Sequence, residues 1–298
     1  METLRPLLPV GYAAGVSAYR QAVADLTPAA LSTHYTDGLR FFHEVFTPEL
    51  KRRLEALSGG AWSLDDYVAY AAGSDVDFMA HVVEAVAARE GVSLFPGDWY
   101  GFLVGATHIE NIRWAEESRD RLACLCIPSV RNGHLTEPML AFLEGAPACL
   151  LNLNLYPTLR AEERRDVAEA LAPLLPRSLL SISFSRGFGL TASQLGVVLV
   201  HRDHPHRARF ATQWTWLTYF HNAIAARAFL AVDHAALAAV DEARRRWVAS
   251  FLAENELPAV ETGSYYVKSF RVDGPVPERL RPLARDGLVR LCFKPPIV

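Results

Sequence analysis

The stretch SISFSRGFGLTASQLG, residues 181–196, joins two apolar segments through a turn that carries glycines and hydroxyl side chains. The residues before the turn, SLLSISFS, and those after it, LGVVLVHR, have the apolar composition of buried strands. Ser183 and Ser185 lead into a basic residue, Arg186, and glycines follow at 187 and 189. The stretch therefore predicts a strand, a polar turn and a second strand.

Short apolar runs alternate with apolar-periodic segments on both sides of this turn, through residues 65–200. This alternation favours a largely parallel sheet with helices on both faces, so we expect an α/β fold. We expect helices at 14–25, at 45–58 with an N-cap at Thr47-Pro48-Glu49, at 76–89, from 136 onward, at 160–175 and over most of 206–255. We expect strands at 121–130, 146–156, 178–185, 195–202, 264–272 and 287–293.

The same pattern divides the chain into four regions. Residues 1–60 are expected to form an N-terminal helical segment that contributes to a small lobe, and residues 61–205 a large α/β domain. Residues 206–245 would form linking helices, and residues 246–298 a C-terminal α+β small lobe. The sequence contains no internal repeat and no low-complexity linker.

Composition excludes several classes of protein. The 298 residues are 51% hydrophobic and carry a net charge of −3, which argues against nucleic acid as the main partner. Apolar runs fall short of the roughly 20 residues that span a membrane, and prolines break the N-terminal apolar stretch, so we expect neither a membrane span nor a signal peptide. We expect a cytoplasmic protein with reduced, buried thiols at Cys124, Cys126, Cys149 and Cys292.

Six motifs follow one another in the chain: AAGSD (71–75), FPGDWYGF (95–102), LNLNLYPT (151–158), the opening stretch, ETGSYYVKSF (261–270) and GLVRLCF (287–293). Their order resembles the fold-type-I pyridoxal-phosphate (PLP) enzymes of the class I/II aminotransferase family, from about residue 35 to the end. The resemblance implies an aminotransferase-like large domain with a smaller α+β lobe. It also implies a homodimer, because two protomers share the active site in that family.

The resemblance implies a former phosphate cradle. A Gly-Ser-Asp turn at a helix N-terminus offers backbone N–H groups and the positive end of the helix dipole to a phosphate. An aromatic residue of the next loop, Trp99 or Tyr100, would stack on the cofactor ring. The cradle would comprise Gly73, Ser74, Asp75, Ser183, Ser185 and Gln194.

Several positions depart from the family pattern. Arg186 stands at the position of the Schiff-base lysine, and a guanidinium neither forms an imine nor acts readily as a base at pH 7. Gln194 replaces the phosphate-binding arginine, and YPTL at 156–159 replaces Asn-Pro-Thr-Gly. Only one helix and one strand fit between Pro157 and Arg186, so we expect the strand with the family's acidic residue to be missing. We therefore predict that PLP is lost and that the protein uses no cofactor.

Other residues keep or offer binding chemistry. Arg290 resembles the family's carboxylate clamp, and a surface ion pair is the alternative. Lys268 shares a strand face with Tyr266, and a solvated lysine is the alternative; the remaining lysines are Lys51 and Lys294. We expect substrate binding by Arg290, Trp99, Tyr100, Asn154 and Lys268, and catalysis by Arg186 as a charge-stabilising group with proton transfer from Tyr156, His108, Glu110 or Tyr266.

The segment HRDHPH holds His201, His204 and His206 in one loop, but two neighbouring arginines oppose a cation, so we assign no metal. His221 and Asn222 lie in an aromatic stretch that favours packing or an interface. Gly-x-Ser-x-Gly and Walker motifs do not occur.

Three functions remain open from the sequence. The first is a cofactor-independent enzyme that acts on an amino acid or an amino-acid-derived intermediate in a specialised biosynthetic pathway. The second is a catalytically silent homologue that binds a partner or metabolite. The third is a protein that holds PLP without a covalent bond.

Overall fold

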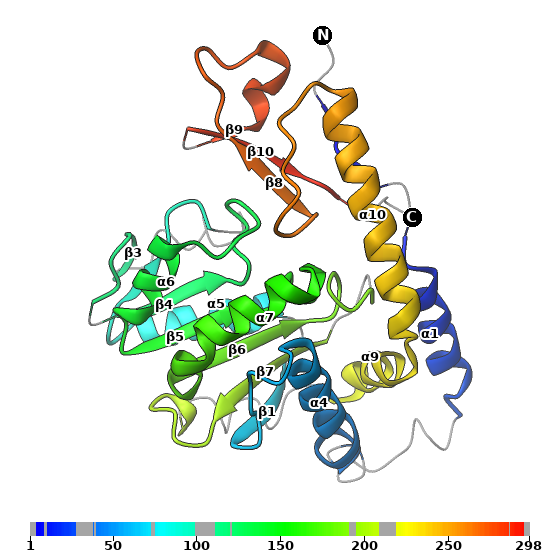
Figure 1. Ribbon diagram of the computed structural model, residues 1–298. Coiled ribbons are helices and arrows are strands. Elements are labelled where there is room, and N and C mark those ends of the chain that lie inside the picture. The colour runs from blue at the N-terminus through cyan, green and yellow to red at the C-terminus, as the bar shows by residue number, and fades with distance from the viewer. Residues whose placement is uncertain are drawn as a thin grey trace.

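Figure 1 shows the computed structural model of the chain, in which a large α/β body and a smaller sheet are joined by one long helix. The structure describes residues 4–8, 11–27, 38, 40–72, 75–98, 111–119, 121–190, 195–208, 219–285 and 287–294, without the side chains of 72, 75–78 and 219–222.

The described residues form a seven-stranded sheet in the order β1-β7-β6-β5-β4-β2-β3. The strands from β3 to β6 are parallel, whereas β7 is antiparallel to both of its neighbours. The expected α/β class with a mostly parallel sheet is confirmed. The strands are β1 Tyr67–Ala72, β2 Val92–Leu94, β3 Ile112–Trp114, β4 Leu122–Cys126, β5 Ala148–Asn152, β6 Ser178–Ser183 and β7 Gly196–His201.

Both faces of this sheet are covered, which explains why its central strands are apolar at successive positions. Leu151 and Leu180 belong to the core on the side of α6 (Glu137–Glu144) and α7 (Ala161–Leu171). Their neighbours Leu150 and Leu179 belong to the core around α5 (Asp75–Ala87). The period of two along each strand thus sends alternate residues into two separate cores.

The small lobe is a three-stranded antiparallel sheet in the order β8-β10-β9. Its core includes Val248 and Leu252 of α10 and also Leu8 from the start of the chain. The 21-residue helix α10 (His234–Glu254) runs from the large body to this lobe, as Figure 1 shows. The small-lobe elements are β8 Val267–Phe270, the 3₁₀ helix η5 Glu278–Leu283, β9 Ala284–Arg285 and β10 Leu288–Cys292.

The first 60 residues are shared between the two parts. Leu7 bridges to Lys294 beside the small lobe, but Phe46 and Leu50 belong to the large core. The expected helix at 45–58 is also longer, since a π-helix, η1 (Phe41–Phe46), runs directly into α4 (Thr47–Leu57). Thr47 is therefore not an N-cap: the residue before it is already helical, and its buried hydroxyl has no partner among the described residues. The remaining elements are α1 Ala13–Ala24, η3 Tyr156–Thr158, η4 Ala172–Arg177 and α9 Tyr219–Ala231.

Among the described helices, none by itself has the length and apolar composition of a membrane span. One bent pair, 223–231 with 234–254, passes the same test jointly at an angle of 83°.

Candidate functional site

The turn that carries Arg186 begins where β6 ends. The hydroxyls of Ser183 and Ser185 lie 3.0 Å apart, and the backbone N–H of Ser185 donates to Ser183 Oγ at 3.4 Å. The guanidinium carbon of Arg186 lies 5.5 Å from the ring centroid of Tyr266, within the range of a cation–π contact. The structure therefore brings together two expected site residues that belong to the large domain and the small lobe.

A buried cluster of tyrosines continues from Tyr266. Arg244 donates to the Tyr266 hydroxyl at 2.8 Å and to the Tyr265 hydroxyl at 3.2 Å. Tyr265 and Tyr12 both donate to Asp241 Oδ1. Burial raises the pKa of the Asp241 carboxyl and, strongly, those of the Tyr12 and Tyr265 phenols. Hydrogen bonds thus connect Asp241, through Tyr265 and Arg244, to the phenol that lies under Arg186.

The sequence pointed to this cluster only through the tyrosine doublet. Tyr12, Asp241 and Arg244 were not expected to take part, because the first lies in the N-terminal segment and the others lie on a helix of ordinary amphipathic composition. Only the fold brings these segments together. Arg244, which is 1% exposed, lies where Tyr12 and the tyrosine doublet meet α10.

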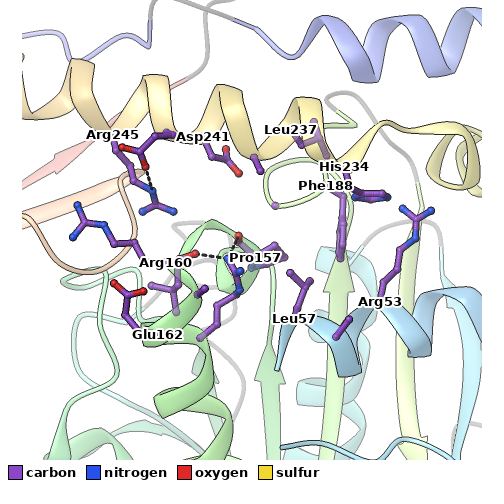
Figure 2. Close-up of a pocket in the computed structure, with 17 residues that line it drawn as sticks. Arg53, Leu57, Pro157, Arg160, Glu162, Phe188, His234, Leu237, Asp241 and Arg245 are labelled. Carbon is purple, nitrogen blue, oxygen red and sulfur yellow. Dashed lines mark hydrogen bonds and ion pairs between the residues drawn. The ribbon is translucent and has the colours of Figure 1, made fainter. Parts of the chain in front are cut away.

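A cavity of about 510 Å³ opens beside the same turn. It lies between α4, the start of α7 and the first half of α10, and Gly187 and Phe188 of the Arg186 turn form part of its wall. Figure 2 shows Arg53 and His234 on one side of the cavity and Arg160 and Arg245 on the other. Its apolar wall includes Leu57, Pro157, Leu159, Phe188 and Leu237.

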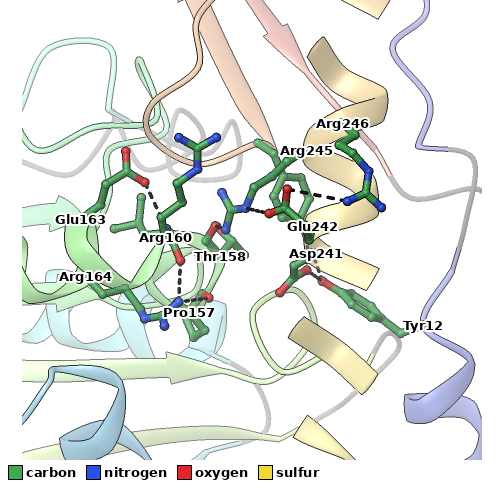
Figure 3. Close-up of polar contacts among 12 residues, drawn as sticks. Tyr12, Pro157, Thr158, Arg160, Glu163, Arg164, Asp241, Glu242, Arg245 and Arg246 are labelled. Atoms are coloured by element: carbon green, nitrogen blue, oxygen red, sulfur yellow. Dashed lines mark hydrogen bonds and ion pairs between the residues drawn. The ribbon is translucent and has the colours of Figure 1, made fainter. Parts of the chain in front are cut away.

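Two arginines hold the backbone of the YPTL segment, as Figure 3 shows. Arg164 Nη1 donates to the carbonyls of Pro157 and Leu159, and Arg245 Nη2 donates to the carbonyl of Thr158. Burial lowers the pKa of Arg164, and its Nε has no partner among the described residues. This segment is therefore fixed by its carbonyl groups.

The expectation that Tyr156 transfers a proton is wrong. Its side chain is fully buried and stacks on Trp62 at 4.9 Å between ring centroids. Its hydroxyl donates to the carbonyl of Arg164 at 2.9 Å, and burial raises its pKa. The phenol is committed to the backbone of α7.

Between Pro157 and Arg186 the structure has one α-helix, α7, and one strand, β6, as expected from the sequence. β5 pairs with β6, and β4 pairs with β5. The loss of a strand relative to the family stays a prediction. The strand before β6 ends at Asn152, an amide, whose Oδ1 accepts from Asn154 N at 2.9 Å and whose Nδ2 lies 3.1 Å from Met79 Sδ. Asn154 is buried, and its Oδ1 has no partner in the described part of the chain.

Arg290 and Lys268 lie on neighbouring small-lobe strands but not opposite each other. Arg290 pairs with Ser269, and Lys268 pairs with Leu291. Arg290 Nη1 donates to the carbonyls of Gly97 and Val130, each at 3.3 Å, and so connects the small lobe to two loops of the large domain.

Lys268 is not a solvated lysine. It is 3% exposed, and its Nζ donates to the carbonyl of Thr262 at 2.7 Å. Burial lowers its pKa to about 8, with Arg245 and Arg160 adding to the effect and Glu163 opposing it.

Asp98 was missed by the sequence analysis, although it stands inside the FPGDWYGF motif. It is fully buried and accepts from Cys126 N at 2.7 Å, Val130 N at 2.9 Å and Ser129 Oγ at 2.5 Å. Burial raises the pKa of Asp98 to about 7, although the three hydrogen-bond donors lower it. Asp98 therefore fixes the loop after β4, one carbonyl of which receives Arg290.

The histidines of HRDHPH turn toward the backbone and toward an acid. His204 Nε2 lies 3.1 Å from the carbonyl of Arg177, and its Nδ1 accepts from His206 N. The His206 ring lies 3.5 Å from a carboxylate oxygen of Glu90.

Asp75 is the first residue of α5, but its side chain is not described. Seven expected site residues lie outside the described part of the chain: Gly73, Ser74, Trp99, Tyr100, His108, Glu110 and Gln194.

Comparison with solved structures identifies the architecture. A probable N-succinyldiaminopimelate aminotransferase from Thermus thermophilus matches with a TM-score of 0.69 at 16% identity, over 99% of this chain and 90% of that one. A putative histidinol-phosphate aminotransferase from Erwinia carotovora matches with a TM-score of 0.62 at 12% identity, over 99% of this chain and 91% of that one. A histidinol-phosphate aminotransferase from Sinorhizobium meliloti, solved with pyridoxal-5'-phosphate, matches with a TM-score of 0.60 at 15% identity, over 99% of this chain and 85% of that one.

The fold is aminotransferase-like, of fold type I. No family model and no curated protein matches the sequence. At these identities the likeness concerns the fold, and the chemistry has to be argued from this chain's own residues.

Proposed function

We propose that this protein is an aminotransferase-like protein that has lost PLP catalysis and binds an amino acid or an amino-acid-derived carboxylate without a cofactor. The observation that carries this proposal is Arg186 at the end of β6, beside the Ser183 and Ser185 hydroxyls and over the ring of Tyr266. A guanidinium stays charged at every physiological pH and cannot condense with an aldehyde as an amine does.

The residues around this turn do not fit a covalently held PLP. The segment 183–196 contains no lysine, and the strand before β6 ends in the amide Asn152. That amide already contacts Met79 Sδ and Asn154 N. An amide cannot supply the negative charge that would keep a pyridine nitrogen protonated.

The same residues can bind and polarise an anion. Arg186 would hold a carboxylate, since a guanidinium donates two parallel hydrogen bonds to that group. The Tyr266 hydroxyl, which accepts from Arg244, would supply or receive a proton at the phenol oxygen. We therefore propose an enzyme rather than a passive scaffold, acting in the cytoplasm on a small biosynthetic intermediate.

Binding of carboxylates tests this proposal. Calorimetric titration with the common amino acids and their 2-oxo acids is expected to find at least one ligand, and its analogue without the carboxylate should bind weakly. Arg186→Gln should weaken that ligand at least about tenfold, or 1.4 kcal/mol. The matched control is Arg202→Gln, which removes an exposed arginine paired with Asp66 at 2.6 Å.

Equal affinity in wild type and Arg186→Gln would contradict the assigned role of Arg186. Failure of every carboxylate to bind would favour the catalytically silent homologue instead.

A further inference from the structure

A second, smaller cavity lies along α10, away from the turn at the end of β6. Its volume is about 220 Å³, and it is bounded by α10 and by the segment that leads into β8. Lys268 forms part of its wall together with Arg160, Arg245 and Arg246. The cavity is therefore small, contains one amine and is lined by three guanidinium groups.

The amine of Lys268 differs from an ordinary surface lysine. It is buried at 3% exposure, and its one hydrogen bond in the described structure goes to the Thr262 carbonyl. With its pKa lowered to about 8, its neutral fraction at pH 7 exceeds that of an ordinary lysine by roughly two orders of magnitude. Only the neutral amine is a nucleophile.

The three guanidinium groups are not equally engaged. Arg245 donates to Thr158 O and lies over the Tyr265 ring at 5.4 Å, and Arg246 lies 3.9 Å from Glu242. The Arg160 guanidinium forms no hydrogen bond or ion pair with any residue that the structure describes. Arg160 is thus the guanidinium of this cavity that can receive a carboxylate.

We propose that Lys268 forms an imine with a small 2-oxo acid whose carboxylate is held by Arg160. The neutral amine adds to the carbonyl carbon, a C=N bond forms, and the carbonyl oxygen leaves as water. The proton that Lys268 carried at rest goes to solvent. A 2-oxo acid fits because it offers a carbonyl group to the amine and a carboxylate to the guanidinium, and Lys268 and Arg160 line the same cavity. This site does not depend on the proposed function at Arg186.

The reaction should require the neutral amine and should therefore rise with pH through about 8. The charged and titratable groups that face Lys268 come from four elements. They are Arg160 and Glu163 at the start of α7, Glu242, Arg245 and Arg246 on α10, Glu261 and Tyr265 before β8, and His134 before α6.

Borohydride trapping with pyruvate tests the proposal, because reduction of the C=N bond fixes the adduct as a secondary amine. Peptide mass mapping of the wild-type protein should place the adduct on Lys268 at least about tenfold above Lys51 and Lys294. Lys268→Met should lose the adduct, whereas Lys51→Met and Lys294→Met should retain it. Equal labelling of the three lysines, or no adduct, would overturn the proposal, and the wild-type map gives this answer even if Lys268→Met fails to fold.

A second comparison tests the carboxylate contact. Arg160→Gln should lower the ratio of pyruvate to acetone labelling at Lys268 about tenfold, since acetone lacks the carboxylate. The ratio cancels any change in the reactivity of the amine itself. Arg165→Gln, which removes an exposed arginine of the same helix, should leave the ratio unchanged. An unchanged ratio in Arg160→Gln would overturn the role of Arg160.

Discussion

Asp98 is the residue whose protonation should show most clearly in the stability of the protein. Burial raises its folded-state pKa from an ordinary 3.8 to about 7, so the folded chain takes up a proton that the unfolded chain does not hold between these values. The free energy of unfolding should therefore fall as pH rises from about 4 to about 7, by up to roughly 4 kcal/mol from this one group.

Asp98→Asn removes that titration and also places an amide against three hydrogen-bond donors. We expect the variant to be about 1–3 kcal/mol less stable than wild type at pH 5 and, because only wild type loses up to roughly 4 kcal/mol as pH rises, to be the more stable of the two at pH 8. Denaturant unfolding across this pH range measures both effects, with the exposed Asp203→Asn as the control. Parallel pH profiles of wild type and Asp98→Asn would show that the carboxyl is not perturbed.

Single residues were predicted unevenly from the sequence. Tyr266 and Arg186 were expected in the site, and they lie together because the turn after β6 meets the turn before β8. The prediction for Tyr156 failed because a sequence motif does not show which way a side chain points. The Tyr156 hydroxyl donates to the backbone of α7. Asp98 was missed because a lone aspartate in a loop carries no sign that it will be buried.

Gly15 of helix α1 lies against the backbone of the turn that carries Arg186, so a side chain at this position should disturb the packing of the whole helix. A Cβ built on Gly15 would lie 2.0 Å from the carbonyl oxygen of Gly189, a backbone atom that cannot rotate away. Gly15→Ala should push α1 off the turn and cost about 1–3 kcal/mol in the free energy of unfolding. Gly11→Ala is the matched control, because its Cβ would meet no atom within 4 Å.

Thermal or denaturant unfolding of the two variants measures this difference. Equal stabilities of Gly15→Ala and Gly11→Ala would mean that α1 does not pack on the turn as described.

The elements themselves were largely predictable, because periodicity reports how each segment is buried. The strands around β4 to β7 and the helices α1, α5 and α7 all fall at expected positions. The start of α4 did not, since Thr47-Pro48-Glu49 has the composition of an N-cap while the helical backbone already begins at Phe41. Packing of Phe42 and Phe46 into the large core outweighs the local capping preference.

The proposed homodimer is a property of the whole molecule. Val16 and Val23 are 45% and 55% exposed and lie seven residues apart on α1, so they share one side of the helix. We expect sedimentation to give twice the chain mass of 33.0 kDa and the double variant Val16→Glu/Val23→Glu to give a single chain. Ser17→Glu, on another side of α1, should remain a dimer. A wild-type protein that sediments as one chain would contradict the proposed dimer.

Tertiary relationships were the part that the sequence could not supply. The six ordered motifs predicted the architecture, but the continuity of β4, β5 and β6 emerged only from their pairing. The cavities beside α10 likewise join segments of the large domain and the small lobe that are distant in sequence.

We propose that Arg186 stands where an amine would hold PLP, and the absorbance of the protein after incubation with PLP tests this most directly. Absorbance after incubation with PLP and removal of the free compound should be compared between Lys268→Met and Arg186→Lys/Lys268→Met, so that the amine of Lys268 contributes to neither. We expect no retained PLP band in Lys268→Met and a retained band in Arg186→Lys/Lys268→Met. A retained band in Lys268→Met, or no retained band in the double variant, would contradict this proposal.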